Sequence, residues 1–141
     1  MTIPGIENQK IEMKILDFEE DDKTWFLMSF NVKSKQGSWE IKDHSLQVYE
    51  VMKIIDWFRD WAENKPNPPT ELVFLEPVLF FEVLKNDAFE KLIRIKFEFE
   101  LKPQFISRDV DCFVDCALTN EHLLELSNTL SEELSKFPSC Y

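Results

Sequence analysis

Glycine and cysteine are scarce in this sequence, and each scarcity argues against a class of function. The two glycines of the 141 residues are Gly5 and Gly37. Because glycine supplies the backbone conformations that phosphate-binding loops use, so few of them argue against a nucleotide-binding protein. The three cysteines, Cys112, Cys116 and Cys140, are an odd number without a Cys-x-x-Cys pair. This excludes a disulfide framework and a thiolate zinc site.

Catalytic and membrane signals are missing as well. The sequence has no Gly-x-Ser-x-Gly, His-Glu-x-x-His or phosphate-loop motif. Its two histidines, His44 and His122, have no second ligand at a metal-binding spacing. No apolar run approaches the roughly 20 residues of a membrane span, and the N-terminus lacks the features of a signal peptide. We therefore expect a cytoplasmic protein that is not an enzyme and needs no metal or cofactor.

Acidic residues outnumber basic ones by 27 to 16, for a formal net charge of −11. Such a surface repels nucleic-acid phosphates and anionic lipid headgroups, and it attracts basic proteins. The charge therefore favours a protein partner over nucleic acid or a membrane. The alternative is that the acidity serves only to keep the protein soluble.

Hydrophobic periodicity predicts the secondary structure. Alternating segments indicate strands, and segments with a period near 3.6 residues indicate amphipathic helices. Strands are expected at residues 10–16, 24–34, 38–42, 72–75, 78–84, 91–101 and 110–118, and helices at 45–63 and 120–137. Short connections favour antiparallel pairing. We expect an α+β domain spanning 1–141, with one curved antiparallel sheet of about six to seven strands packed against a central and a C-terminal helix.

The strand at 91–101 has the clearest pattern in the chain. Its inward face is expected to be Ile93, Ile95, Phe97, Phe99 and Leu101. In the strand at 110–118, Val110 is expected to face inward together with Cys112 and Cys116, which lie too far apart along the strand for a disulfide and are interpreted as small core residues. No internal repeat is visible in the sequence.

The helix at 45–63 has an apolar stripe that includes Met52, and Glu50 is expected on its polar face. Asp43 or Ser45 is expected to cap its first turn, and Pro66 prevents its continuation. In the second helix, Thr119-Asn120 is the expected N-cap.

The candidate binding residues are acidic and aromatic. Glu19, Glu20, Asp21 and Asp22 form an exposed tract that is interpreted as a docking loop, with a plain solvated hairpin loop and a calcium site as alternatives. The tract lacks the ligand spacing and central glycine of an EF-hand. Trp25 and Trp57 are the tryptophans expected to be exposed, where they would act as interface anchors.

Carboxylates on the polar strand faces leave an enzymatic alternative open. Glu98, Glu100, Asp111 and Asp115 could serve as an acid and base pair in a sugar-active hydrolase. That reading requires two carboxyl groups about 5–9.5 Å apart in a cleft. A solvated sheet face is the competing interpretation.

Several short segments together resemble the WapI-type immunity proteins. The most distinctive are the Gly37-Ser38-Trp39 turn and Glu76-Pro77 between two apolar runs. The resemblance extends from 11 to 138 and also includes 32–33, Trp57, 74–81, 99–103 and 136–138.

The resemblance implies a function. Proteins of this family are the partners of tRNA-cleaving C-terminal domains of bacterial cell-wall-associated toxins. It therefore implies an immunity protein that neutralises a basic toxin domain, which is consistent with the negative charge. The alternative is an adaptor or self-associating domain without a toxin partner, and the sequence leaves monomer and homodimer both open.

Overall fold

The computed structural model describes residues 1–138, which form eight strands and two α-helices. The first half of the chain contains β1 (Thr2–Pro4), β2 (Lys10–Phe18), β3 (Trp25–Ser34), β4 (Gly37–Gln47) and α1 (Val48–Ala62). The second half contains β5 (Glu71–Leu72), β6 (Leu79–Asn86), β7 (Glu90–Phe97), β8 (Cys112–Thr119) and α2 (Asn120–Ser135). Two 3-10 turns, η1 (Ile6–Asn8) and η2 (Phe99–Leu101), complete the fold.

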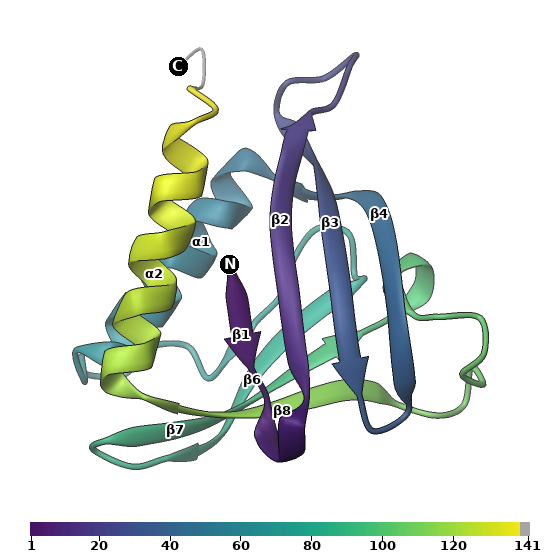
Figure 1. Ribbon diagram of the computed structural model, residues 1–141. Coiled ribbons are helices and arrows are strands. Elements are labelled where there is room, and N and C mark those ends of the chain that lie inside the picture. The colour runs from purple at the N-terminus through teal and green to yellow at the C-terminus, as the bar shows by residue number, and fades with distance from the viewer. Residues whose placement is uncertain (139–141) are drawn as a thin grey trace.

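The architecture repeats even though the sequence does not. In each half, four antiparallel strands pair in sequential order and a helix follows. Figure 1 shows α1 and α2 together on one side, the first sheet opposite them and the second sheet crossing below. The α+β class, the antiparallel pairing and both helices are confirmed. The structure differs in that the described strands number eight, because β1 was not predicted, and in that they form two sheets, because β4 and β5 do not pair.

The two sheets and the helices share one hydrophobic core. On the first sheet, Met13 pairs with Phe30, which pairs with Ile41 on the next strand. The ring of Phe30 meets that of Phe97 from the second sheet edge to face, with ring centres 6.4 Å apart. Period-two strands thus place their apolar faces against each other, as the sequence predicted.

The expected cysteine environment is confirmed for the two residues that the structure describes. Cys112 and Cys116 are buried on the same face of β8. Burial raises the pKa of Cys112 to about 11 and that of Cys116 to about 12. Both thiols are therefore protonated core groups near neutral pH. Cys140 lies outside the described residues.

Helix α2 packs along α1. Its buried side chains are Leu123, Leu126, Ser127 and Leu130, and the Ser127 hydroxyl donates to the main-chain oxygen of Ile55 at 2.8 Å. The expected N-cap is confirmed, since Thr119 Oγ1 accepts a hydrogen bond from the amide of His122 at 3.1 Å. Neither of the described α-helices is long and apolar enough to cross a membrane.

The start of α1 was predicted wrongly. Strand β4 continues to Gln47, so Asp43 and Ser45 lie within it and Gln47 is the N-cap. Glu50, expected on the polar face, is buried, because its carboxylate accepts from the amides of Gln47 at 2.9 Å and Leu75 at 2.8 Å. Met52, expected in the apolar stripe, is exposed. The buried face of α1 therefore includes Glu50 and excludes Met52, while Val48, Val51, Ile55 and Phe58 are buried as predicted.

The end of β7 also differs from the prediction. The strand stops at Phe97, and the chain turns at Phe99, whose φ of 48° breaks the alternation. As a result Phe99 is 68% exposed, while Leu101 fills the core. Val110, expected to face inward, is exposed before β8 begins at Cys112.

Candidate partner-binding surface

The acidic tract forms the connection between β2 and β3, at the end of that hairpin (Figure 1). Glu20, Asp21 and Asp22 are exposed and Glu19 is half-buried. The Asp22 carboxylate accepts from the Thr24 hydroxyl at 2.6 Å and from the Thr24 amide at 2.9 Å, and these bonds lower its pKa. The Asp22 carboxylate is therefore ionised near neutral pH, and its two bonds to Thr24 order the end of the loop.

The two tryptophans proposed as anchors have different environments. Trp25 is half-buried at the start of β3, so part of its ring is accessible. Trp57 is only 3% exposed, and the prediction that it lies on the surface is wrong. Its indole donates to the carbonyl of Pro69 at 2.7 Å, and the indole of Trp61 donates to the same oxygen at 3.3 Å. The loop after α1 folds back over both rings and covers them.

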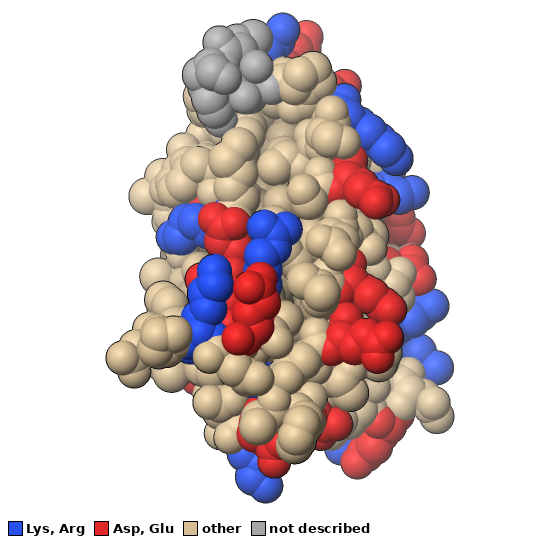
Figure 2. Space-filling model, turned by 90° about the vertical axis from the view of Figure 1, so that its left-hand side faces the viewer, with Lys and Arg blue, Asp and Glu red and all other residues tan. Residues whose placement is uncertain are grey.

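Negative charge is spread well beyond the tract. Figure 2 views the side formed by the helices and shows one cluster in which acidic and basic side chains lie side by side, further acidic groups, and uncharged surface between them. The tract at 17–22 holds five of the 27 acidic residues, Asp17 included. The net charge of −11 is therefore a property of the whole molecule.

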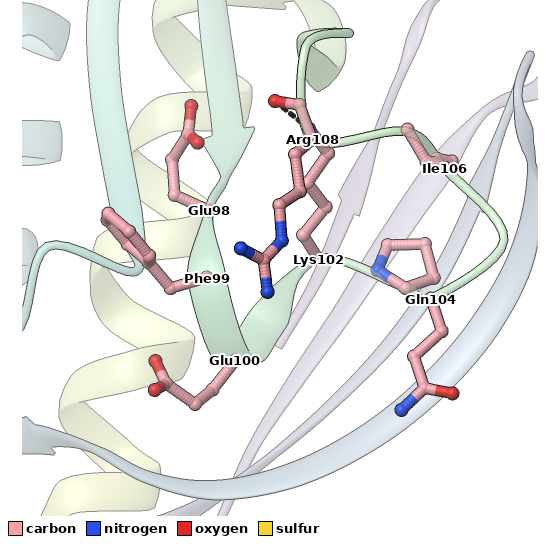
Figure 3. A pocket seen from close by; sticks show the side chains of 8 residues that line it. Glu98, Phe99, Glu100, Lys102, Gln104, Ile106 and Arg108 are labelled. Atoms are coloured by element: carbon pink, nitrogen blue, oxygen red, sulfur yellow. Dashed lines mark hydrogen bonds between the residues drawn. The ribbon is translucent and has the colours of Figure 1, made fainter.

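A second surface was not predicted from the sequence. Two pockets of about 540 and 340 Å³ adjoin, and both are lined by Glu98 and Phe99. Figure 3 shows Glu98, Phe99 and Glu100 on one side of the larger pocket, with the guanidinium of Arg108 reaching in from the other. We define the Phe99 surface as Val73, Phe80, Glu98, Phe99 and Glu100, which line these pockets, together with Asp43, whose carboxylate lies close enough to interact with the charge of Glu100.

Hydrogen bonds hold the main chain on both sides of Phe99, at Glu98 and at Leu101. The amide of Glu98 donates to the carbonyl of Val78 at 2.8 Å. The amide of Leu101 donates to the carbonyl of Glu98 at 3.0 Å, and the carbonyl of Leu101 accepts from the Trp39 indole at 3.1 Å. These bonds hold an exposed phenylalanine in a left-handed conformation that costs about 1–3 kcal/mol.

The carboxylates of this surface, on Asp43, Glu98 and Glu100, form no ion pair within 4 Å in residues 1–138. The Arg108 guanidinium nevertheless lies in the same pocket as Glu98 and Glu100. Partial burial and then the charge of Glu100 raise the pKa of Asp43. The Lys102 ammonium is engaged by the carbonyls of Arg108 and Val110 in its own loop.

The outer face of the second sheet holds the remaining carboxylates considered for catalysis. The Arg94 guanidinium forms a bidentate salt bridge with the Asp115 carboxylate, with N–O distances of 2.8 and 3.0 Å. Its Cζ atom lies 3.9 Å from the centre of the Phe113 ring. Lys96 lies 3.8 Å from Asp111. Residues 1–138 contain no group of three or more His, Cys, Asp or Glu side chains placed to hold a metal ion. Two of the four carboxylates are thus held in ion pairs of the sheet.

The sequence pattern gave no sign of the Phe99 surface. Phe99 occupies an inward position of an unbroken alternation, and only the turn at η2 reverses it. That turn depends on partners far away in the sequence, because Trp39 lies 62 residues from Leu101.

Comparison with known proteins locates the chain in one family. The model of the Immunity protein WapI-like family matches residues 2–138. Searches of curated proteins and of solved structures find no match. The match covers nearly the whole chain, including both sheets, both helices and the Phe99 surface. The chain therefore belongs to the WapI-like immunity protein family.

Proposed function

We propose that this protein is an immunity protein that binds the C-terminal toxin domain of a secreted bacterial toxin and blocks its activity in the cytoplasm. The observation that carries the proposal is the family match over residues 2–138. An inhibitor of this kind needs no catalysis and no cofactor. It needs a rigid scaffold that presents carboxylates and a few apolar anchors.

The proposed toxin is a nuclease with a basic active-site surface. A nuclease must hold nucleic-acid phosphates with lysine and arginine side chains. A partner with a net charge of −11 complements such a surface and can accelerate encounter to about 10⁸–10⁹ M⁻¹s⁻¹ at low salt. Fast capture is advantageous where free toxin would kill the cell that makes it.

The acidic tract at the β2–β3 connection is proposed as one steering element. Glu19, Glu20, Asp21 and Asp22 lie on an ordered loop, which keeps their charges together. Trp25, at the start of the following strand, is proposed to contact the toxin beside this loop. Trp57 has no such role, because it is buried.

Co-expression tests the proposal. The chain is expressed together with the C-terminal toxin domain encoded next to its gene, and growth of the host is scored. We expect the toxin domain alone to arrest growth, and co-expression to restore it through a complex that dissociates more readily at high salt. A neighbouring domain that is toxic and still kills in the presence of this protein would refute the pairing.

The alternative is an adaptor that associates with itself through exposed apolar side chains. It is favoured by the exposure of Leu75 and Phe99, which are 66% and 68% exposed. Analytical ultracentrifugation of the isolated protein distinguishes the two functions. A concentration-dependent dimer that F99A abolishes would support the alternative, and a monomer would leave the apolar side chains free for a toxin.

A further inference from the structure

Phe99 combines two unfavourable features at one position. Its side chain is 68% exposed, and its backbone has a φ of 48°, where residues with a β-carbon are rare. Neither feature helps the chain to fold, since an exposed phenyl ring buries little area and a glycine would relieve the backbone. Strain of this kind tends to persist where the surrounding structure enforces it and a function uses it.

The surroundings of Phe99 enforce this conformation. Glu98 is hydrogen-bonded to Val78 on one side, and Leu101 is fully buried and bonded to Trp39 on the other. The exposed ring therefore stands on a short turn that is bonded at one end to the residue before β6 and at the other to β4 of the first sheet. A rigid aromatic side chain on a fixed backbone loses little freedom on binding, which is a property of interface anchors.

The charges around the ring identify the partner's chemistry. Asp43 comes from β4, and Glu98 and Glu100 flank Phe99 in sequence. In the described part of the chain these three carboxylates have no ion-pair partner within 4 Å. Lys102 is engaged by main-chain oxygens and Lys96 lies beside Asp111, while Arg108 lines the same pocket as Glu98 and Glu100 without pairing with either. A lysine or arginine of a partner would meet unpaired carboxylates next to an apolar ring.

We propose that the Phe99 surface binds a basic segment of the toxin domain, with Phe99 entering an apolar pocket and Asp43, Glu98 and Glu100 receiving a lysine or arginine beside it. This inference rests on the proposed function and adds the surface that performs it. A second copy of this chain fits less well, because a symmetric contact would place the same carboxylates against each other. A nucleic acid is repelled for the same reason.

Binding of the purified neighbouring toxin domain tests the contact. F99A removes the ring and keeps the rest of the surface. We expect F99A to weaken the complex by about 30-fold or more, mainly through faster dissociation, as for a central anchor. The matched control is F89A, since Phe89 is 79% exposed on the β6–β7 turn, away from these carboxylates. We expect F89A to bind within about threefold of the wild type.

A glycine variant separates binding from folding. Glycine tolerates the φ of 48°, so F99G is expected to be at least as stable to heat as F99A while binding equally poorly. The double variant E98Q/E100Q is expected to slow association and to reduce its dependence on salt. Together these variants distinguish an anchor with charged flanks from a residue needed only for folding.

The outcomes also separate this proposal from the proposed function. If the wild-type protein neutralises the toxin domain and F99A and F99G bind it as tightly, the Phe99 contact is refuted and the immunity function stands. If the wild-type protein fails to bind or neutralise the toxin domain, the proposed function and this inference fall together. Equal losses for F99A and F89A would also overturn the assignment, because the effect would not be specific to this surface.

Discussion

The indole of Trp39 donates a hydrogen bond to the main-chain oxygen of Leu101 at 3.1 Å, and this bond ties the edge strand of the first sheet to the turn that follows β7. The same indole packs edge to face against Phe97, with ring centres 5.5 Å apart. Phe105 packs on its other side at 6.2 Å and lies against Gly37, where a β-carbon would come within 2.8 Å of the Phe105 ring. The η2 turn is therefore held by the first sheet.

Replacing Trp39 by phenylalanine tests this support. W39F keeps an aromatic ring beside Phe97 but leaves the Leu101 oxygen without its donor. We expect the free energy of unfolding to fall by about 1–2 kcal/mol, measured as a lower urea midpoint at an unchanged slope. Hydrogen exchange at the amides of Leu101 and Lys102 should accelerate. Unchanged exchange at these two amides would show that η2 does not depend on Trp39.

Glu50 is expected to stabilise the start of α1 and the loop before β6 together. Its carboxylate accepts from Gln47 and from Leu75, and a glutamine offers one acceptor oxygen in place of two. We expect E50Q to lower the free energy of unfolding by about 1–2 kcal/mol. The control is D56N, an exposed acidic residue of the same helix, with an effect within about 0.5 kcal/mol. If a denaturant titration shows the same loss of unfolding free energy for E50Q and D56N, the two hydrogen bonds of Glu50 do not stabilise the fold.

Lys91 gives the folded protein a pH dependence. Its buried ammonium donates to the side-chain oxygens of Asn64 at 2.6 Å and Asn120 at 2.8 Å. Burial lowers its pKa from the ordinary 10.5, with Asp87 opposing the change. Between the lowered pKa and 10.5 the unfolded chain binds more protons than the folded chain, so this group's contribution to stability rises with pH.

The variant K91M isolates that contribution. We expect the stability of the wild type relative to K91M to increase as the pH is raised towards 10.5, because the cost of the buried charge is relieved as the amine loses its proton. Urea denaturation at each pH measures the difference. Parallel stability profiles for the two proteins would show that Lys91 does not titrate in this range.

The thiols of Cys112 and Cys116 are expected to react only when the protein unfolds. Both are buried, and burial raises their pKa to about 11 and about 12, so the reactive thiolate is rare at pH 8. The measurement uses the C140S variant, in which Cys112 and Cys116 are the only cysteines, and follows their reaction with a chromogenic disulfide reagent. We expect labelling at the rate of unfolding and acceleration by urea. Rapid labelling of the native protein would contradict their place in the core.

The acidic loop should govern the rate of association with the toxin domain. E19Q/E20Q/D21N removes three charges and keeps Asp22, whose bonds to Thr24 order the loop. We expect slower association and a flatter dependence on salt. The control E121Q/E125Q/E132Q removes three exposed charges from α2 and so matches the change in net charge. If both triple variants slow association equally, total charge rather than the loop steers the encounter.

Local sequence patterns predicted an element correctly where its hydrogen-bond partners lie close in the sequence or where buried and exposed positions alternate regularly. The strand predicted at 24–34 is Trp25–Ser34, because its apolar side chains alternate along its length. The N-cap at Thr119 was predictable since its hydroxyl bonds an amide three residues away. The same locality explains the correct placement of both cysteines on one face of β8.

The errors at Trp57 and Glu50 share one physical cause, which is a partner from the segment between α1 and β6. Trp57 lies at the edge of its helix stripe and is covered by the loop that brings the Pro69 carbonyl to its indole. Glu50 has the polarity of a surface residue and is buried because the amide of Leu75 meets it. Periodicity predicts on which face of a helix or strand a residue lies. It holds no information on which distant segment of the chain packs over that face.

Composition and local periodicity were enough to predict the α+β class, the antiparallel pairing, the strong negative charge and the lack of known catalytic motifs, because each of these is a property of short segments or of the whole composition. The division of the strands into two sheets, the burial of Trp57 and the exposure of Phe99 depend on how distant segments pack together. The turn that exposes Phe99 is held at Leu101 by a hydrogen bond from Trp39, 62 residues away. Such a bond forms only after both sheets have packed, so no local pattern encodes it.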